Sequence, residues 1–458
     1  MVTSTMGFRP GRPRRMAPPP GSVAAAIDSA QLVRRWLAGF AVLLLTPLLV
    51  RVMIGGPTWA QLVDLTGLFA LSALVGTFVL VSRLRALSRA TGITALLSAH
   101  RALGVLSAVS VLVHIAVVIA ANPRNLALLG WVDAPPRARA AVGASLALAG
   151  VIALGVHRAK VRQDYELWRW AHLVLAVAAA MLSALHVLLI DDLVQDPVMR
   201  WVLAGLTVAL VASLVYRWHG MAVRSSEHVV REVRLESDSV CTVVLDPRGA
   251  PLQFAPGQFA WLRLSRRGTP DAEEHPFTIA SSAESGACEF TVRSTGDFGT
   301  MLRRLTPGTP AWIDGPYGSC SVDLLPQPGA GAVMIASGVG ITPMMSMLRT
   351  LADRRDRRPL LLVRGAREPG ELFFRGELAH LATRLDLTVL EVVRRPPPGW
   401  TGAAGDVDAP LLQAVLPPTA HRAGIDCFVC GPPTFVERVA GDLSDLGVPD
   451  HRLHTEQF

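Results

Sequence analysis

The feature that most constrains this chain is a series of six apolar stretches in its first half, each close to the length that crosses a lipid bilayer. A helix rises about 1.5 Å per residue, so about 20 apolar residues span the hydrocarbon core. The stretches lie at residues 34–54, 59–82, 98–121, 138–157, 167–190 and 197–218. The sequence therefore predicts a membrane α domain, a bundle of six transmembrane helices over residues 31–219 in the lipid bilayer.

The charge of the chain is divided between its two halves. Residues 1–219 carry 20 Arg and Lys against 8 Asp and Glu, whereas the remainder carries 24 against 28. Because the positive excess lies among the apolar stretches, it does not indicate a nucleic-acid partner. Five scattered cysteines do not form a disulfide scaffold.

The loops between the apolar stretches predict the orientation in the membrane. Cations gather in the loops at 83–99 and 157–166 and after residue 216, and the alternate loops have few; that at 191–196 reads DDLVQD. By the positive-inside rule, both termini and the second half lie in the cytoplasm of a multi-pass plasma-membrane protein. The Arg- and Pro-rich residues 1–30 are predicted to be a disordered basic tail. Arg34 and Arg35 also fit a twin-arginine signal, but no small-residue cleavage site follows.

Four histidines occupy matched places in two of the stretches. His100 and His114 are 14 residues apart, as are His172 and His186. That spacing is about 21 Å along a helix, with a rotation of only about 40°, so each helix presents two imidazoles on one face. Two stacked pairs suit two b-type haems, His100 with His172 on the inner side and His114 with His186 on the outer. The alternative is that these histidines only form hydrogen bonds between helices.

The second half has the pattern of a soluble protein. Residues 220–325 contain alternating strand-like runs such as VVREVRLE, CTVVLD and QFAWLRL, which predict an antiparallel β-barrel. Residues 326–458 open with strand, glycine turn, helix and strand, which predicts a parallel α/β nucleotide-binding domain. In its first turn Gly338 and Gly340 allow backbone amides to approach a pyrophosphate, and Thr342-Pro343 begins the helix.

A second signal in this domain is the run CFVCGPP at residues 427–433. As a C-x-x-C motif it suggests zinc or a redox dithiol, but no second Cys or His pair accompanies it. Side chains alternate along a strand, so only Cys430 is expected to face a ligand at the strand end.

Together these residues resemble the NADPH oxidase and ferric reductase superfamily, and the soluble half is similar to ferredoxin–NADP reductase. The motifs that carry the resemblance are the four histidines, HPFTIAS (275–281), VRSTGDFGT (292–300), IDGPYGS (313–319), ASGVGITP (336–343), FVCGPPTF (428–435) and Phe458. The resemblance covers about residues 35–458. It implies a transmembrane oxidoreductase with FAD, NADPH and two b haems as cofactors.

The resemblance also implies roles for individual residues of the FAD-binding barrel. His275, Pro276, Phe277 and Thr278 stand where the superfamily holds the flavin, with the aromatic ring against the isoalloxazine and the hydroxyl toward N5. The residues expected to bind the FAD pyrophosphate, which requires a cation and free amides, are Arg293, Gly299 and Thr300.

In the nucleotide-binding domain the resemblance assigns the nicotinamide-nucleotide loop to Gly338, Gly340 and Thr342. Cys430 and Glu456 would border the hydride path, and Phe458 would cover the flavin until nicotinamide displaces it. Arg367 follows the second strand, where a cation pairs with a 2′-phosphate, so NADPH is expected, with NADH as the alternative.

Two departures bear on the electron acceptor. The chain has no iron–sulfur cysteine segment, so electrons are expected to pass from flavin to haem. The oxygen-reducing members are expected to carry a further histidine where this chain has Val118. Oxygen is the first expectation for the acceptor and a ferric chelate the second; Arg51 and Arg124 near the outer surface would attract either superoxide or an anionic chelate. The alternatives are an electron-delivery subunit for an extracytoplasmic protein, and a membrane-anchored flavin reductase without haem.

Overall fold

The computed structural model describes residues 22–54, 56, 58–84, 87–88, 93–157, 165–223, 225–264, 274–294, 296–325 and 328–457. Two compact units are present. The helical unit consists of Leu32–Leu87 and Ala95–Gly220, and the other unit is formed mainly by Met221–Phe458.

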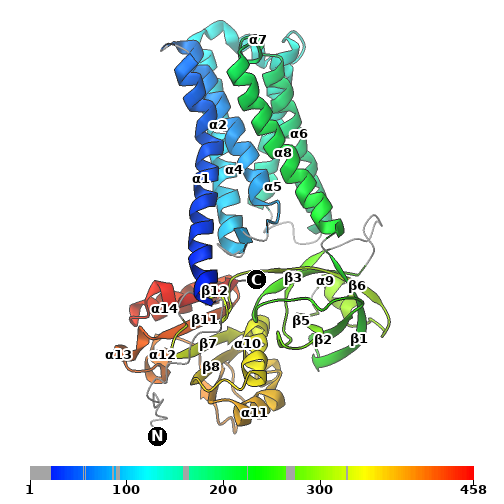
Figure 1. The fold of residues 1–458 in the computed structure, drawn as a ribbon, viewed down its shortest axis with the longest axis vertical. Helices are drawn as coiled ribbons and strands as arrows, with labels where there is room; N and C mark the ends of the chain where they lie inside the picture. The colour runs from blue at the N-terminus through cyan, green and yellow to red at the C-terminus, as the bar shows by residue number, and fades with distance from the viewer. Residues whose placement is uncertain are drawn as a thin grey trace. The chain divides into compact units, whose positions relative to one another are not determined.

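The helical unit contains six long apolar helices (Figure 1). They are α1 (Ser22–Ile54), α2 (Trp59–Leu80), α4 (Ile93–Ala121), α5 (Pro136–His157), α6 (Tyr165–Leu188) and α8 (Pro197–Val223). Each contains a span long and apolar enough to cross a membrane, and all six spans lie within three residues of the predicted bounds. Two short helices, η1 (Pro123–Leu129) and α7 (Asp191–Gln195), lie between long ones.

The expected disordered tail is wrong for its last nine residues, because α1 begins at Ser22. The run SVAAAIDSA contains four alanines, the strongest helix former, and leads directly into the apolar span. The earlier part of that tail, and the cations at residues 85, 89 and 158–162, lie outside the described residues.

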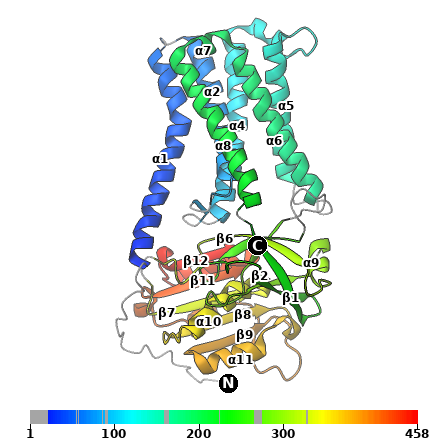
Figure 2. The same ribbon diagram turned by 45° about the vertical axis from the view of Figure 1, so that its right-hand side comes forward.

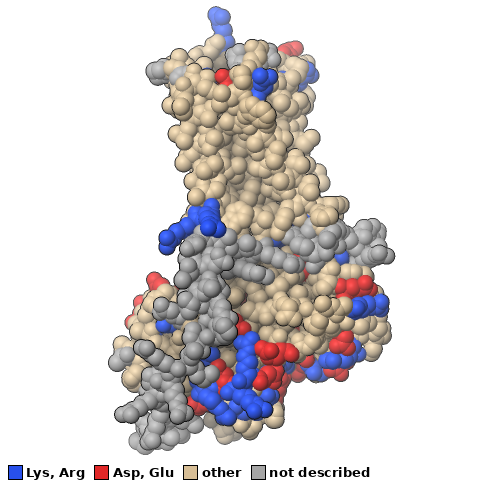
Figure 3. Space-filling view, viewed as in Figure 1, with Lys and Arg blue, Asp and Glu red and all other residues tan. Residues whose placement is uncertain are grey.

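The helical unit places apolar side chains on both its outside and its inside. Leu112, Val174 and Val208 are each at least 60% exposed, and the middle of this unit shows no charged atoms in Figure 3. Such a surface is costly in water and suits lipid. Small residues allow close packing inside: a Cβ atom built on Gly150 of α5 would lie 3.0 Å from Leu175 of α6.

The second unit begins with an antiparallel sheet of order β4-β3-β6-β1-β2-β5. Its strands are β1 (Ser226–Ser237), β2 (Val240–Pro247), β3 (Phe259–Arg263), β4 (His275–Thr278), β5 (Cys288–Arg293) and β6 (Pro310–Tyr317). A bridge between Ile279 and Phe290 joins the two edges, so the sheet closes around an apolar core. The short helix α9 (Gly296–Leu302) follows β5.

The remainder of this unit is a parallel sheet of order β10-β9-β8-β7-β11-β12, most of whose strands are labelled in Figure 2. Its strands are β7 (Gly331–Ser337), β8 (Leu360–Ala366), β9 (Leu387–Val393), β10 (Ala403–Ala404), β11 (Ile425–Gly431) and β12 (Leu453–Gln457). The accompanying helices are η2 (Gly338–Gly340), α10 (Ile341–Asp353), η3 (Pro369–Glu371), α11 (Arg375–Arg384), α12 (Ala409–Val415), α13 (Thr419–Arg422), α14 (Pro433–Asp445) and η4 (Asp450–Arg452). Apolar cores cover both faces of the sheet. The predicted fold of helix bundle, barrel and parallel α/β domain is thus confirmed.

Candidate functional site

The helical unit brings the rings of two predicted histidines close together. The ring centroids of His100 on α4 and His172 on α6 lie 6.4 Å apart, with their planes tilted by 59°. Two imidazoles that bind one metal ion from opposite sides have centroids about 6.4 Å apart, since each contributes a bond of about 2.0 Å and about 1.2 Å from nitrogen to centroid. The spacing therefore fits a six-coordinate haem iron between these rings.

Hydrogen bonds fix which nitrogen of three histidines faces away from the protein backbone. The Nδ1 atoms lie within hydrogen-bonding distance of backbone carbonyls in three pairs: His100 with Thr77 (3.2 Å), His114 with Val63 (3.0 Å) and His186 with Arg137 (2.9 Å). A carbonyl only accepts, so each Nδ1 carries the proton and each Nε2 keeps its lone pair for a metal. A histidine that donates from Nδ1 to a neighbouring helix can therefore still bind a metal ion through Nε2.

His172 is oriented differently. Its ring stacks on Trp168, one turn earlier on α6, at 5.3 Å and 25°. The indole donates from Nε1 to the carbonyl of Leu154 on α5 at 2.9 Å, which fixes the stacked pair against the neighbouring helix. Among the described residues, no group of three or more His, Cys, Asp or Glu side chains is arranged to hold a metal ion. A haem iron held by two imidazoles requires no such group.

In the barrel, the predicted flavin segment lies beside an aromatic ring, Phe298, for which the sequence motifs indicate no role. His275 and Phe277 of β4 lie 4.0 and 6.0 Å from the ring of Phe298 on α9, at angles of 32° and 17°. These three neighbouring rings form an aromatic cluster of the kind that packs against a flat heterocycle. Pro276 and Thr278 alternate with them along the strand, so they face the other side.

The predicted pyrophosphate residues lie where β5 passes into α9. A Cβ atom on Gly299 would lie 2.9 Å from the carbonyl oxygen of Arg293, so glycine allows α9 to pack on the strand end. The hydroxyl of Thr300 donates to the carbonyl of Gly296 within the helix. A Cβ atom on Gly338, whose φ is +58°, would lie 3.4 Å from the Arg293 guanidinium. The structure thus brings the cation of the FAD motif to the turn of the nucleotide motif.

The nucleotide turn is packed directly on the end of β11. A Cβ atom on Gly340 would lie 2.2 Å from the carbonyl oxygen of Cys430, a distance that no side chain permits. Thr342 is buried in the first turn of α10, where its hydroxyl donates to the carbonyl of Val339. Glycine at 340 is therefore required by close approach of two backbones, as expected for a nucleotide turn.

The two cysteines of the CFVCGPP run face opposite sides of the sheet. Cys427 belongs to one apolar core and Cys430 to the other, as strand alternation predicts, but the structure buries both. Burial, with the neighbouring Cys320 and Glu456, raises the pKa of the Cys430 thiol well above its usual range. Burial likewise raises the pKa of Glu456 to about 7. Cys430 is therefore a neutral thiol, and Glu456 exchanges a proton near neutral pH. Phe458 lies outside the described residues.

A second arginine lies beside the one predicted to select NADPH. Arg367 follows β8 and is exposed, and its carbonyl accepts from the backbone N–H of Arg395, which follows β9, at 2.9 Å. Both strands are parallel, so their carboxyl ends meet at one edge of the sheet. In the sequence, Arg395 belongs to the pair RR that follows LEVV. That pair indicates a site only once β8 and β9 are known to be neighbours.

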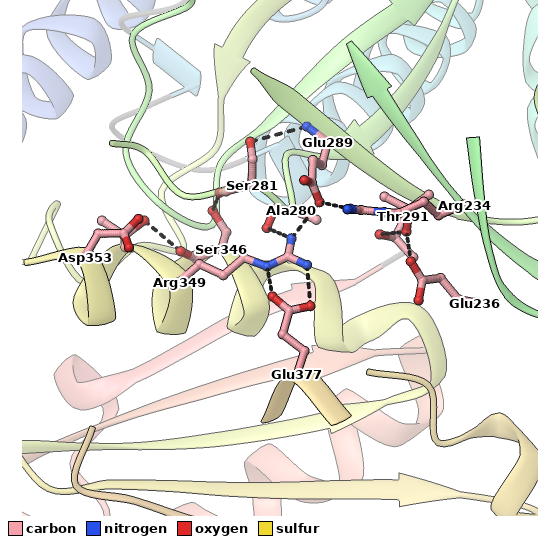
Figure 4. Close-up of polar contacts among 12 residues, drawn as sticks. Arg234, Glu236, Ala280, Ser281, Glu289, Thr291, Ser346, Arg349, Asp353 and Glu377 are labelled. Carbon is pink, nitrogen blue, oxygen red and sulfur yellow. Dashed lines mark hydrogen bonds and ion pairs between the residues drawn. The ribbon is translucent and has the colours of Figure 1, made fainter. Parts of the chain in front are cut away.

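Arg349 of α10 joins the nucleotide-binding domain to the barrel (Figure 4). Its guanidinium binds both carboxylate oxygens of Glu377 at 2.6 and 2.7 Å, Glu289 of β5 at 3.0 Å and the carbonyl of Ala280 at 2.7 Å. Although burial alone would lower the pKa of Arg349, the two carboxylates outweigh it and raise the pKa, so the guanidinium stays charged.

Two hydroxyls on the same face of α10 continue this contact. Ser346 accepts from the backbone N–H of Gly257 at 3.1 Å and donates to the carbonyl of Ser281 at 2.8 Å. Thr350 accepts from the backbone N–H of Ala283 at 2.9 Å. One helix face thus fixes the two cofactor-binding domains relative to each other.

Three family models match consecutive parts of the chain. Residues 66–183 match the ferric reductase like transmembrane component, residues 225–321 an FAD-binding domain, and residues 334–441 the oxidoreductase NAD-binding domain. These domains define a membrane oxidoreductase that depends on FAD and NAD(P). The chain thus has the domain architecture of the NADPH oxidase and ferric reductase superfamily.

Individual relatives match slightly less than half of the chain. The reductase subunit of stachydrine N-demethylase from Rhizobium meliloti is 31% identical over 218 residues, covering 46% of this chain and 60% of the relative. The glycine betaine monooxygenase reductase subunit of Chromohalobacter salexigens is 30% identical over 213 residues, 45% and 56% of the two chains. The chain thus spans less than two thirds of these curated relatives. Among solved structures, the FAD/NAD-binding domain of a Vibrio cholerae nitric oxide dioxygenase is similar, with 24% identity, a TM-score of 0.46, and coverage of 51% of this chain and 99% of that domain.

Proposed function

We propose that the chain is a flavocytochrome b that passes electrons from cytosolic NADPH through FAD and two b haems to an acceptor outside the membrane. The observation that carries this proposal is the 6.4 Å separation of the His100 and His172 rings. The fixed tautomers of His100, His114 and His186 support it further. When bound, FAD accepts a hydride and releases single electrons, which is what a haem iron accepts.

The residues of the chain have distinct tasks in this proposal. Arg293 neutralises the FAD pyrophosphate and lies next to the turn at Gly338. The aromatic cluster packs on the flavin, whereas the side chain of Thr278 lies on the other face of β4, away from that cluster. The neutral thiol of Cys430 lines the hydride path without adding charge, and Glu456 exchanges a proton near pH 7. The α10 face with Arg349 keeps the two binding domains in register.

NADPH is the proposed donor. Its 2′-phosphate carries negative charge that NADH lacks, and Arg367 and Arg395 meet at the sheet edge where the adenosine end of a dinucleotide lies. The neighbouring Arg394 is paired with Asp406 at 2.7 Å, which leaves Arg367 and Arg395 as the better candidates of the three.

The proposed location is the plasma membrane, with residues 221–458 in the cytoplasm. The cations around the loops at 83–99 and 157–166 support this orientation. With it, His100 and His172 lie at the inner level and His114 and His186 at the outer.

Oxygen is the proposed acceptor, and a ferric chelate is the second candidate. Of the two outer cations expected to attract either, Arg51 is paired with Asp64 at 2.8 Å, whereas Arg124 is exposed. The names of the curated relatives favour a further candidate, an electron-delivery role, because both are reductase subunits of larger enzymes.

Reoxidation of the haems distinguishes these acceptors. Protein loaded with FAD and haem is reduced with dithionite without air and then mixed with oxygen or with ferric citrate, while the α band is followed. Rapid loss of the band with oxygen, together with superoxide, supports the proposal. Loss only with ferric citrate identifies a ferric reductase, and persistence with both identifies an electron-delivery subunit.

A further inference from the structure

Three polar side chains of α4, spaced seven residues apart, reach backbone carbonyls of α2 that are also spaced seven residues apart. Figures 1 and 2 show these two helices side by side. The three pairs are His100 Nδ1 with Thr77 O at 3.2 Å, Ser107 Oγ with Ala70 O at 3.0 Å, and His114 Nδ1 with Val63 O at 3.0 Å. The two haem-ligand contacts are thus the ends of a ladder whose middle member is Ser107.

The equal spacing on both helices fixes their register. Seven residues make two turns when the helices coil slightly around each other, so the three contacts lie on one line along the interface. Each carbonyl has a second lone pair available besides the one used within the helix. A shift of one residue along the helix axis would break all three contacts at once.

Two glycines of α2 make room for this arrangement. A Cβ atom on Gly67 would lie 3.0 Å from Cε1 of His114, and one on Gly76 would lie 2.7 Å from the Leu103 side chain. The hydroxyl of Thr66 also lies 3.2 Å from His114 Nδ1. The face of α2 toward α4 therefore leaves space for the ring of His114. It also allows α4 to pack closely in this register.

We propose that α2, which carries no histidine, is the positioning element for both haem ligands of α4, and that Ser107 is its central positioning residue. This inference rests on the proposed function, in which His100 and His114 bind haem iron. Ser107 is 1% exposed and acts through the helix register. A histidine whose Nδ1 is held by a carbonyl has a fixed ring plane, and the ring plane influences the electronic state of the bound metal.

The test compares two serines of the same helix. In Ser107→Ala the contact with α2 is removed. Ser110→Ala is the matched control, because Ser110 is also buried and its hydroxyl donates to Leu106 within α4 at 2.7 Å. Low-temperature electron paramagnetic resonance of the oxidised protein reports the ligand planes of each haem. The transfer of haem to excess apomyoglobin reports how firmly the haems are held.

The expected result is that S107A shifts the low-field signals of both haems and releases haem about threefold faster than wild type. S110A matches wild type in both measurements. Ser107→Thr keeps the hydroxyl and restores the wild-type signals, whereas the equally bulky Ser107→Val behaves like S107A.

Two outcomes overturn the inference while the proposed function stands: S107A retains wild-type signals and haem release, or only one of the two haem signals shifts. An absence of haem in the wild-type protein overturns the proposed function itself. The two failures are therefore distinguishable in one set of spectra.

Discussion

The α-carbon of Gly340 faces the carbonyl oxygen of Cys430 so closely that a Cβ atom at residue 340 would lie 2.2 Å from that oxygen. The turn after β7 therefore rests on the end of β11, and the position tolerates no side chain without movement of the backbone. This contact holds the proposed nucleotide turn beside Cys430, the thiol proposed to border the hydride path.

Gly340→Ala is expected to lower the free energy of unfolding by about 1–3 kcal/mol, the usual cost of forcing extra atoms into a packed site. It should also slow flavin reduction by NADPH. The matched control is Gly376→Ala in α11, where nothing lies within 4 Å of the added Cβ. That change should stabilise by about 0.5–1 kcal/mol. Thermal unfolding followed by flavin fluorescence measures the change in stability of each variant. Equal effects of the two variants would contradict the close backbone contact at Gly340.

His114→Leu is expected to remove about half of the reduced-minus-oxidised α band, because one of two bis-imidazole sites loses a ligand. His157→Leu is the control. His157 is exposed at the end of α5, and its Nδ1 lies 2.9 Å from the carbonyl of Ala153 in the same helix. An unchanged band in H114L would mean that the histidines only join helices.

Much of this site was predictable from the sequence, and the reason differs from part to part. The six spans follow from length and apolarity alone, and the paired histidines follow from a spacing of 14 residues. The strands around Gly338 follow from the local order of strand, glycine turn, helix and strand. Each of these signals lies within one segment of the chain.

What the sequence did not reveal depends on contacts between distant segments. Phe298 meets His275 only because the barrel closes, and Arg395 meets Arg367 only because β8 and β9 are neighbours. Arg349 and Glu289 are 60 residues apart in the chain and lie in different domains. The start of α1 was missed because its alanine-rich residues follow a segment dominated by Pro and Arg.

Arg349→Met is expected to lower the free energy of unfolding by about 3 kcal/mol, because it leaves the carboxylates of Glu289 and Glu377 without their shared cation. Arg349→Lys should be intermediate, since one ammonium cannot reproduce the bidentate contact. Arg358→Met is the control, because Arg358 pairs with Asp356, two residues away in the same loop. Chemical denaturation measures all three. A loss for R349M no larger than that for R358M would contradict the domain-joining role.

The pH dependence of stability should contain a contribution from Glu456. Its folded-state pKa of about 7 lies above the usual 4.5. Stability from the protonated carboxyl is therefore complete below about pH 4.5 and is lost as the pH rises through 7, by no more than about 3 kcal/mol. Glu456→Gln should flatten this part of the profile, and the exposed Glu437→Gln should not. Melting temperatures between pH 5 and 8 provide the test, and parallel profiles for wild type and E456Q would disprove it.

Arg367→Ala is expected to raise the KM for NADPH about tenfold, the effect of losing one charge-assisted contact with a phosphate. The KM for NADH is the internal control and should not change, because NADH has no 2′-phosphate. Steady-state reduction of the flavin measures both constants. An equal rise in the KM for both nucleotides would show that Arg367 does not recognise the 2′-phosphate of NADPH.

The central claim is that electrons from NADPH reach haem iron held by histidines of α4 and α6. The most direct measurement adds NADPH without air to purified protein supplied with FAD and haem, and records the visible spectrum before and after. We expect a b-type α band that grows as NADPH is consumed. Bleaching of the flavin with no α band would contradict it, because electrons would then stop in the soluble half.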